Sequence, residues 1–106
     1  MARSSFVLRI SPADYETYVD RHRHVYPDLL AAFGEAGITS YSIYYYEGLL
    51  FAYMEAEDFA YVSKVLSSHP ASHRWAAFMS DILLCWENGN DSVQIEEVFH
   101  YAHQDQ

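Results

Sequence analysis

Two β-prone segments joined by a two-residue turn occupy the middle of the chain, and this pattern constrains the fold more than any other feature. Residues 38–46 are rich in β-branched and aromatic side chains, residues 49–55 form a second segment of the same kind, and Glu47-Gly48 separates them. A two-residue connection containing glycine between such segments is typical of a hairpin. The pattern therefore predicts an antiparallel β-hairpin over residues 38–55.

Helical segments flank this hairpin on both sides. Ser11-Pro12 is typical of a helix start, with serine as the N-cap and proline in the first turn. The apolar positions that follow recur every three or four residues, and Pro27 predicts a kink or a restart of that helix. In chain order we expect a strand at residues 5–10, helical residues 12–34, the hairpin, helical residues 58–67 and 70–82, and a strand at residues 93–101.

This order of elements, β-α-β-β-α-β, matches the ferredoxin-like plan of an α+β domain, in which helices cover one face of an antiparallel sheet. A chain of 106 residues has room for one hydrophobic core, so we expect residues 1–106 to form a single domain. The other face of such a sheet must pack against another surface to be shielded from water. A second copy of the chain is the simplest cover, so the fold class predicts a homodimer with packed sheet faces.

The composition argues against several classes of protein. With 15 acidic residues against 6 lysines and arginines, the net charge is -9, which disfavours a nucleic-acid partner. No apolar segment approaches the ~20 residues of a membrane-spanning helix, and the N-terminus lacks a signal-peptide layout. Cys85 is the single cysteine, which excludes a disulfide within one chain. We therefore expect a cytoplasmic protein without a membrane partner.

Tyrosine is unusually frequent, with 10 residues in a chain that is 17% aromatic. This number indicates either a pocket that is both apolar and hydrogen-bonding, or a large subunit interface. In the strand at residues 38–46, Tyr41 and Tyr45 point to one face and Tyr44 and Tyr46 point to the other. We expect one face to meet the helices and the other to meet the partner subunit.

Tyr18 and His22 are four residues apart on the first helix, so their side chains share its apolar face. His22 is then either a core histidine bonded to a backbone carbonyl or a general acid or base, because histidine titrates closest to neutral pH. Trp75, in the last helical region, either fills the core or stacks on the apolar face of a sugar. Arg21 and Arg23 are expected on the solvent side, paired with acids.

Metal binding is not expected from this sequence. His69 and His73 have the spacing of two ligands on one helix, but no acidic residue lies between them and His69 precedes a proline. A metal site needs three or four converging ligands. The chain also contains no glycine-rich phosphate loop and no nucleophile-elbow motif.

Six short motifs follow one another from about Phe6 to Phe99. They are Tyr18-x-x-x-His22, Tyr26-Pro27-Asp28-Leu29, Tyr41-Ser42-Ile43-Tyr44, Leu49-Leu50-Phe51-Ala52, Arg74-Trp75 with Phe78-Met79, and Glu97-Val98-Phe99. Each motif alone is weakly specific, but the ordered set with near-matching spacings resembles the L-rhamnose mutarotase family.

The resemblance implies a dimeric α/β barrel built from ferredoxin-like subunits. It also implies an isomerase that interconverts the α and β anomers of L-rhamnose or a related 6-deoxy sugar without a cofactor. His22 matches the family's proton donor, and Tyr18, Tyr41 and Trp75 match its sugar-binding positions. The second group that exchanges protons stays open at this point: Asp28, a tyrosine hydroxyl or a water molecule could serve.

Two positions depart from the family pattern, because Ala76 and Tyr26 stand where the family carries tryptophan. A missing indole at Ala76 removes one pocket wall or rim contact, so L-fucose or another 6-deoxy sugar stays open as the substrate. Two other classes also stay open. One is a cofactor-independent oxygenase or haem-degrading protein with the same barrel plan, and the other is a non-catalytic small-ligand binding protein.

Overall fold

The structure is a computed structural model that describes residues 2–102. The strands are β1 (Ala2–Ile10), β2 (Ile38–Tyr46), β3 (Leu49–Ala56), β4 (Leu83–Leu84) and β5 (Ser92–Ile95). The helices are α1 (Tyr15–His22), α2 (Pro27–Glu35), α3 (Phe59–Ser68) and α4 (Pro70–Met79), and a short 3-10 helix, η1 (Pro12–Asp14), precedes α1. None of the helices in this described part is long and apolar enough to cross a membrane.

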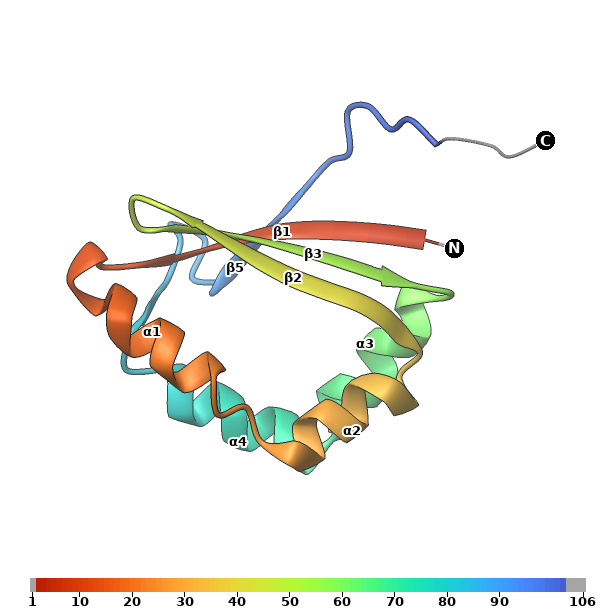
Figure 1. Cartoon of the computed structure of the whole chain (residues 1–106), viewed down its shortest axis with the longest axis horizontal. Coiled ribbons are helices and arrows are strands. Elements are labelled where there is room, and N and C mark those ends of the chain that lie inside the picture. Colours follow the sequence, from red (N-terminus) through yellow and green to blue (C-terminus); the bar gives the residue numbers. More distant parts are fainter. Residues whose placement is uncertain (1, 103–106) are drawn as a thin grey trace.

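The strands form one curled antiparallel sheet, and α1 to α4 all lie on the same face of it (Figure 1). The strand order is β2-β3-β1-β4, and β5 pairs with β1 as well. Helices α1 and α4 lie under one end of the sheet, whereas α2 and α3 lie under the other (Figure 1). The predicted α+β class, with helices on one face of an antiparallel sheet, is confirmed.

The β2–β3 hairpin extends one residue beyond the predicted range, to Ala56, and has a turn that requires glycine. Both turn residues have a positive φ, 44° at Glu47 and 88° at Gly48, as a tight two-residue hairpin turn demands. The Ile10 amide donates a hydrogen bond of 2.9 Å to the Gly48 carbonyl. A Cβ atom on Gly48 would lie 2.9 Å from the Ile10 carbonyl oxygen, so there is no space for a side chain.

The first helical segment breaks at Pro27, which confirms the predicted restart. α1 ends at His22, and Pro27 begins α2 after a short turn. Tyr26 has the extended backbone (ψ 130°) that a following proline favours. The break allows α1 and α2 to lie under different ends of the sheet (Figure 1).

The C-terminal strand is shorter than predicted. We expected a strand over residues 93–101, but β5 ends at Ile95 and the chain then leaves the sheet on the side away from the helices (Figure 1). Val98 and Phe99 are 95% and 82% exposed. The prediction was wrong because alternating apolar residues extend a strand only where a neighbouring strand is available. The two-residue β4 was not predicted, since so short a segment has no periodicity.

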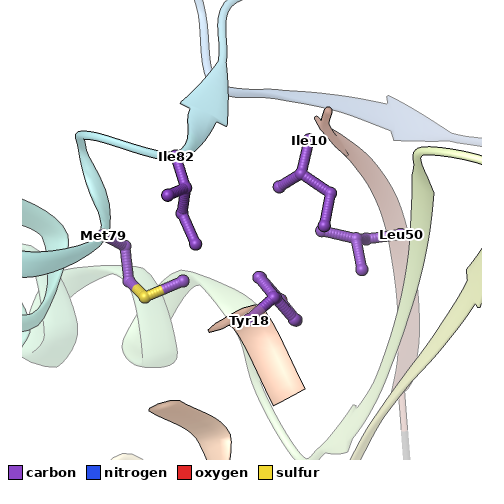
Figure 2. Close-up of a cluster of buried hydrophobic side chains, with 5 residues drawn as sticks. All are labelled: Ile10, Tyr18, Leu50, Met79 and Ile82. Atoms are coloured by element: carbon purple, nitrogen blue, oxygen red, sulfur yellow. The ribbon is translucent and has the colours of Figure 1, made fainter. Parts of the chain in front are cut away.

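The helices contact the sheet through two separate hydrophobic clusters. The larger cluster lies between the sheet, α1 and the end of α4, and its side chains point toward one another: Ile10, Tyr18, Leu50, Met79 and Ile82 (Figure 2). The second cluster joins α3 and the end of α2 to the far end of β3, through Val62, Ala36 and Ala56. Between these clusters the aromatic residues of the inner face line a cavity and do not fill a core.

Replacing Gly48 by alanine is expected to destabilise the protein by roughly 1–3 kcal/mol, because the new Cβ needs a positive φ and meets the Ile10 carbonyl. Gly34→Ala is the matched control. Gly34 lies in α2 with open space around its Cβ position, so alanine there should raise stability by about 0.5–1 kcal/mol. Urea unfolding of both variants measures the two changes, and equal effects of the two substitutions would contradict the turn argument.

Candidate active site

A pocket of about 740 Å³ lies between the inner face of the sheet and the helices. Its size falls within the range of ~300–1,000 Å³ that is usual for small-molecule sites. The sequence-predicted site residues Tyr18, His22, Tyr41 and Trp75 all line it, although they come from α1, β2 and α4. Among the described residues that line the pocket there is no aspartate or glutamate.

The His22 ring is held in one orientation by its own helix. Its Nδ1 atom lies 2.9 Å from the Tyr18 carbonyl oxygen. A carbonyl oxygen only accepts hydrogen bonds, so Nδ1 carries the proton and Nε2 of the neutral ring keeps its lone pair. The ring also stacks on the Tyr18 ring, with a centroid distance of 4.1 Å and an interplanar angle of 24°. The four-residue spacing on one helix therefore produces both contacts.

Burial keeps His22 neutral and its tyrosine neighbours protonated. Burial lowers the pKa of His22, and the hydrogen bond to the Tyr18 carbonyl opposes this effect in part. Burial raises the pKa of Tyr41 to about 12. Burial, together with the nearby Tyr41, also raises the pKa of Tyr18 above its ordinary value. At neutral pH the pocket therefore presents an unprotonated imidazole nitrogen beside two phenolic hydroxyl groups.

The hydroxyl groups of Tyr18 and Tyr41 have no hydrogen-bond partner among the described residues. Tyr18 is only 6% exposed, and its ring stacks on the His22 ring. The Tyr41 ring is fixed by Phe33 and Phe6, with centroid distances of 5.4 Å and 6.4 Å. A buried phenol normally finds a partner, so these two groups leave hydrogen-bonding capacity for a ligand inside the pocket.

Trp75 forms the wall of the pocket on the α4 side. Its indole meets the His22 ring edge to face, with a centroid distance of 5.3 Å and an interplanar angle of 88°. Tyr26 and Phe78 pack against the same indole at 5.2 Å and 5.6 Å. Ala76 is exposed and does not line the pocket, so the missing second indole does not change the wall that Trp75 forms in this chain.

The acidic candidate for the second proton-transfer group lies away from the pocket, and the two arginines near His22 differ in their pairing. The Asp28 carboxylate, on the first turn of α2, forms an ion pair with Arg74 and does not line the pocket. Arg21 pairs with Asp81 as expected, with a distance of 2.8 Å. Arg23, by contrast, lines the pocket and has no ion-pair partner among residues 2–102, so its expected pairing with an acid was wrong.

The two histidines with ligand-like spacing are used by the backbone. His69 Nδ1 accepts a hydrogen bond from the Ala71 amide and caps α4. His73 Nε2 lies 2.6 Å from the Ser67 carbonyl oxygen. In the described part of the chain, no three histidine, cysteine, aspartate or glutamate side chains gather closely enough to hold a metal ion.

Sequence reasoning missed one residue that lines the pocket and one that packs behind its wall. Ser72 also lines it, and its position three residues before Trp75 on α4 is a signal that could have identified it. Tyr26 was noted as part of a motif, but its packing against Trp75 joins residues that are far apart in the chain. No local spacing could have predicted that contact.

The fold and the pocket together define an α+β protein with a pocket of small-molecule size between a curled sheet and its helices. A family model described as L-rhamnose mutarotase matches residues 3–101. A protein named L-rhamnose mutarotase from Sinorhizobium fredii is 35% identical over 105 residues, with 96% of this chain and all of the relative covered. One of the same name from Flavobacterium johnsoniae is 33% identical over 101 residues, with 92% and 94% covered. The chain belongs to the L-rhamnose mutarotase family, which confirms the resemblance.

Two solved structures have the same fold. A crystal structure of an L-rhamnose mutarotase from Formosa agariphila superposes with a TM-score of 0.81 at 24% identity and covers 96% of this chain and all of that one. The tetracenomycin F2 cyclase of Streptomyces glaucescens, a polyketide cyclase, superposes with a TM-score of 0.70 at 19% identity and covers 98% of this chain. At these identities the likeness concerns the fold alone.

The His22 ring should titrate below pH 6.5, with the neutral form protonated on Nδ1, because burial disfavours the charged ring and the Tyr18 carbonyl fixes the tautomer. Nitrogen-15 NMR of the histidine rings over a pH series measures both properties, and the His22→Asn spectrum identifies the signals. Since the unfolded chain binds this proton first, His22 should reduce folding stability as the pH falls below about 6.5. A His22 ring that titrates above 6.5, or that carries the proton on Nε2, would contradict the geometry.

Proposed function

We propose that this protein is a cofactor-independent isomerase that interconverts the α and β anomers of L-rhamnose or a closely related 6-deoxy sugar. The observation that carries the proposal is a neutral His22 with a free Nε2 lone pair, next to two phenol groups without partners, in a pocket of suitable size. Membership of the L-rhamnose mutarotase family supports the same reaction.

Mutarotation needs one proton removed from the anomeric hydroxyl and one delivered to the ring oxygen. In this proposal His22 Nε2 takes the proton of the anomeric hydroxyl while the bond between C1 and the ring oxygen breaks. The electron pair of that bond goes to the ring oxygen, which takes a proton from a tyrosine hydroxyl or a water molecule. The open aldehyde turns about C1–C2, and the hydroxyl formed from the ring oxygen attacks the other face of C1 while its proton returns to the tyrosinate or hydroxide that supplied it. The carbonyl oxygen takes the proton of the His22 imidazolium, which makes the residue a base in opening and the proton donor in closing.

The pocket lining suits an uncharged sugar. The lining combines the hydroxyl groups of Tyr18, Tyr41 and Ser72 with apolar side chains such as Phe33 and Met54. Hydroxyl groups of the sugar can use the phenols, and a 6-deoxy sugar adds a methyl group that gains from apolar surroundings. Trp75 offers a flat surface to the C–H face of the ring.

Replacing His22 by asparagine should lower the enzymatic acceleration of anomer exchange by roughly 10²–10⁴, the usual contribution of one acid–base group. One pure anomer of L-rhamnose is dissolved with and without protein, and its anomeric proton signals are followed by NMR. His24→Asn is the control, because His24 is exposed and lies outside the pocket. In the native protein the rate should fall as the pH drops through the lowered pKa of His22, since the protonated ring has no lone pair. Full activity in His22→Asn would exclude the proposal.

We further propose that two chains form a dimeric α/β barrel of ferredoxin-like subunits with their sheet faces packed together. The sheet face away from the helices carries Tyr44 and Phe51 as direct cross-strand neighbours, and they are 65% and 37% exposed. Residues 96–102 leave the sheet on this side (Figure 1), and Phe99 and Tyr101 among them are largely exposed. An apolar face of this kind supports an interface with a second copy of the chain.

Introducing aspartate at both Tyr44 and Phe51 should convert the dimer to single chains, because the two carboxylates would be buried without partners in the interface. Sedimentation velocity at micromolar concentration measures the mass before and after the change. Tyr61→Asp is the matched control, since Tyr61 is an exposed aromatic on α3, on the helical side. A native protein with the mass of one chain would contradict the proposed dimer.

The alternative classes have less support. The family match favours neither an oxygenase-like or haem-degrading protein nor a non-catalytic binding protein. The anomer-exchange measurement separates the remaining sugars when it is repeated with L-fucose and L-mannose. The cytoplasmic location stays a prediction from the sequence.

A further inference from the structure

We infer that the Asp28–Arg74 ion pair positions the pocket wall, acting through Tyr26 and Trp75. The pair joins the first turn of α2 to the middle of α4. None of Asp28, Arg74 and Tyr26 lines the pocket. They are therefore candidates for positioning residues, whose effect on a ligand passes through the Trp75 indole.

The contacts form a continuous path from the ion pair to the imidazole. The Arg74 guanidinium binds the Asp28 carboxylate and lies above the Tyr26 ring, 5.8 Å from its centroid. The Tyr26 ring meets the Trp75 indole edge to face, at 5.2 Å and 90°. Trp75 in turn meets the His22 ring at 5.3 Å and 88°. Each aromatic contact depends on ring orientation, so a displacement of Tyr26 reaches the pocket wall.

A second ion pair holds the C-terminal end of α4 through Asp81, which follows the helix. The Arg21 guanidinium, on α1, donates hydrogen bonds of 2.8 Å and 3.0 Å to the two oxygens of the Asp81 carboxylate. It also lies 4.3 Å above the centroid of the Phe78 ring. Trp75 therefore lies on a helix that α1 holds at one point and α2 at another. Loss of the Asp28–Arg74 pair would free the side of Trp75 that faces the break between α1 and α2.

The exposure of the Asp28–Arg74 pair indicates that it positions side chains and does not stabilise the fold. The Arg74 and Asp28 side chains are 56% and 52% exposed, and ion pairs this exposed contribute little to the free energy of unfolding. The same pair can matter to a ligand, because small displacements of a binding wall change affinity. Its removal should therefore alter sugar binding while the protein keeps its thermal stability.

The test compares Asp28→Asn, Arg74→Gln and the double variant in anomer exchange of L-rhamnose, so this part rests on the proposed function. Each single change should raise the KM for L-rhamnose by a factor of roughly 2–30 and change kcat less. The double variant should match the single ones, since both remove one interaction. Asp28→Glu keeps the carboxylate, so its KM for L-rhamnose should stay close to the native value. Glu57→Gln and Lys64→Gln, which remove equivalent exposed charges, are the controls and should leave KM unchanged.

A second measurement needs no substrate. The chain has 2 tryptophans, so in a Trp86→Phe background the fluorescence reports Trp75 alone. Asp28→Asn and Arg74→Gln should each shift its emission, and their combination should add nothing further. If native protein does not accelerate anomer exchange, the proposed function fails while this spectrum still tests the positioning role. Single variants that match the controls in both KM and emission, additive effects in the double variant, or a change confined to the unfolding temperature would each overturn the inference.

Discussion

The site depends on the way in which the helices meet the sheet at two separate clusters. Ile10, Leu50 and Met79 fill the space at one end, and small residues such as Ala36 and Ala56 allow close approach at the other. The inner face between them carries Tyr41 and Tyr45, whose hydroxyl groups would lose hydrogen bonds to water in a fully collapsed core. The penalty for burying phenols without partners keeps this middle region available to a polar ligand.

The electrostatic character of the pocket differs from that of the chain as a whole. The protein carries a net charge of -9, yet the described lining of the pocket contains no carboxylate. No anion among the described residues lies beside His22 to favour the charged ring, and the hydrogen bond to the Tyr18 carbonyl offsets only part of the cost of burial, so the pKa of His22 lies below its ordinary value. The same environment holds Tyr18 and Tyr41 in the neutral form. A set of neutral donors and acceptors is suited to moving protons on a neutral sugar.

Ion pairs at the surface and aromatic contacts inside have different roles around this pocket. The aromatic rings of Tyr18, His22 and Trp75 contribute buried area and define its shape. The Asp28–Arg74 pair connects α2 to α4, and Arg21 of α1 binds both the Asp81 carboxylate and the Phe78 carbonyl of α4. The Asp28–Arg74 pair is exposed on both sides and adds little to stability, so its role is to hold α2 against α4 beside the pocket wall.

Local spacing in the sequence was sufficient to predict several features of the structure. The hairpin follows from two alternating segments around Glu47-Gly48, and the restart of the helix follows from the backbone restriction at Pro27. The Tyr18–His22 stack follows from a spacing of four on one helix. Alternation in a strand put Tyr41 and Tyr45 on one face, and the structure shows that this face is the one toward the helices. All of these are interactions between residues that are close in the chain, where backbone geometry alone determines the distance.

Only the tertiary structure decided which distant residues meet. It brought Trp75 against His22, paired Asp28 with Arg74 away from the pocket, and left residues 96–102 outside the sheet. The physical reason is that such contacts depend on the distance between the helices and the sheet. The two clusters set this distance, and it results from packing of the whole chain.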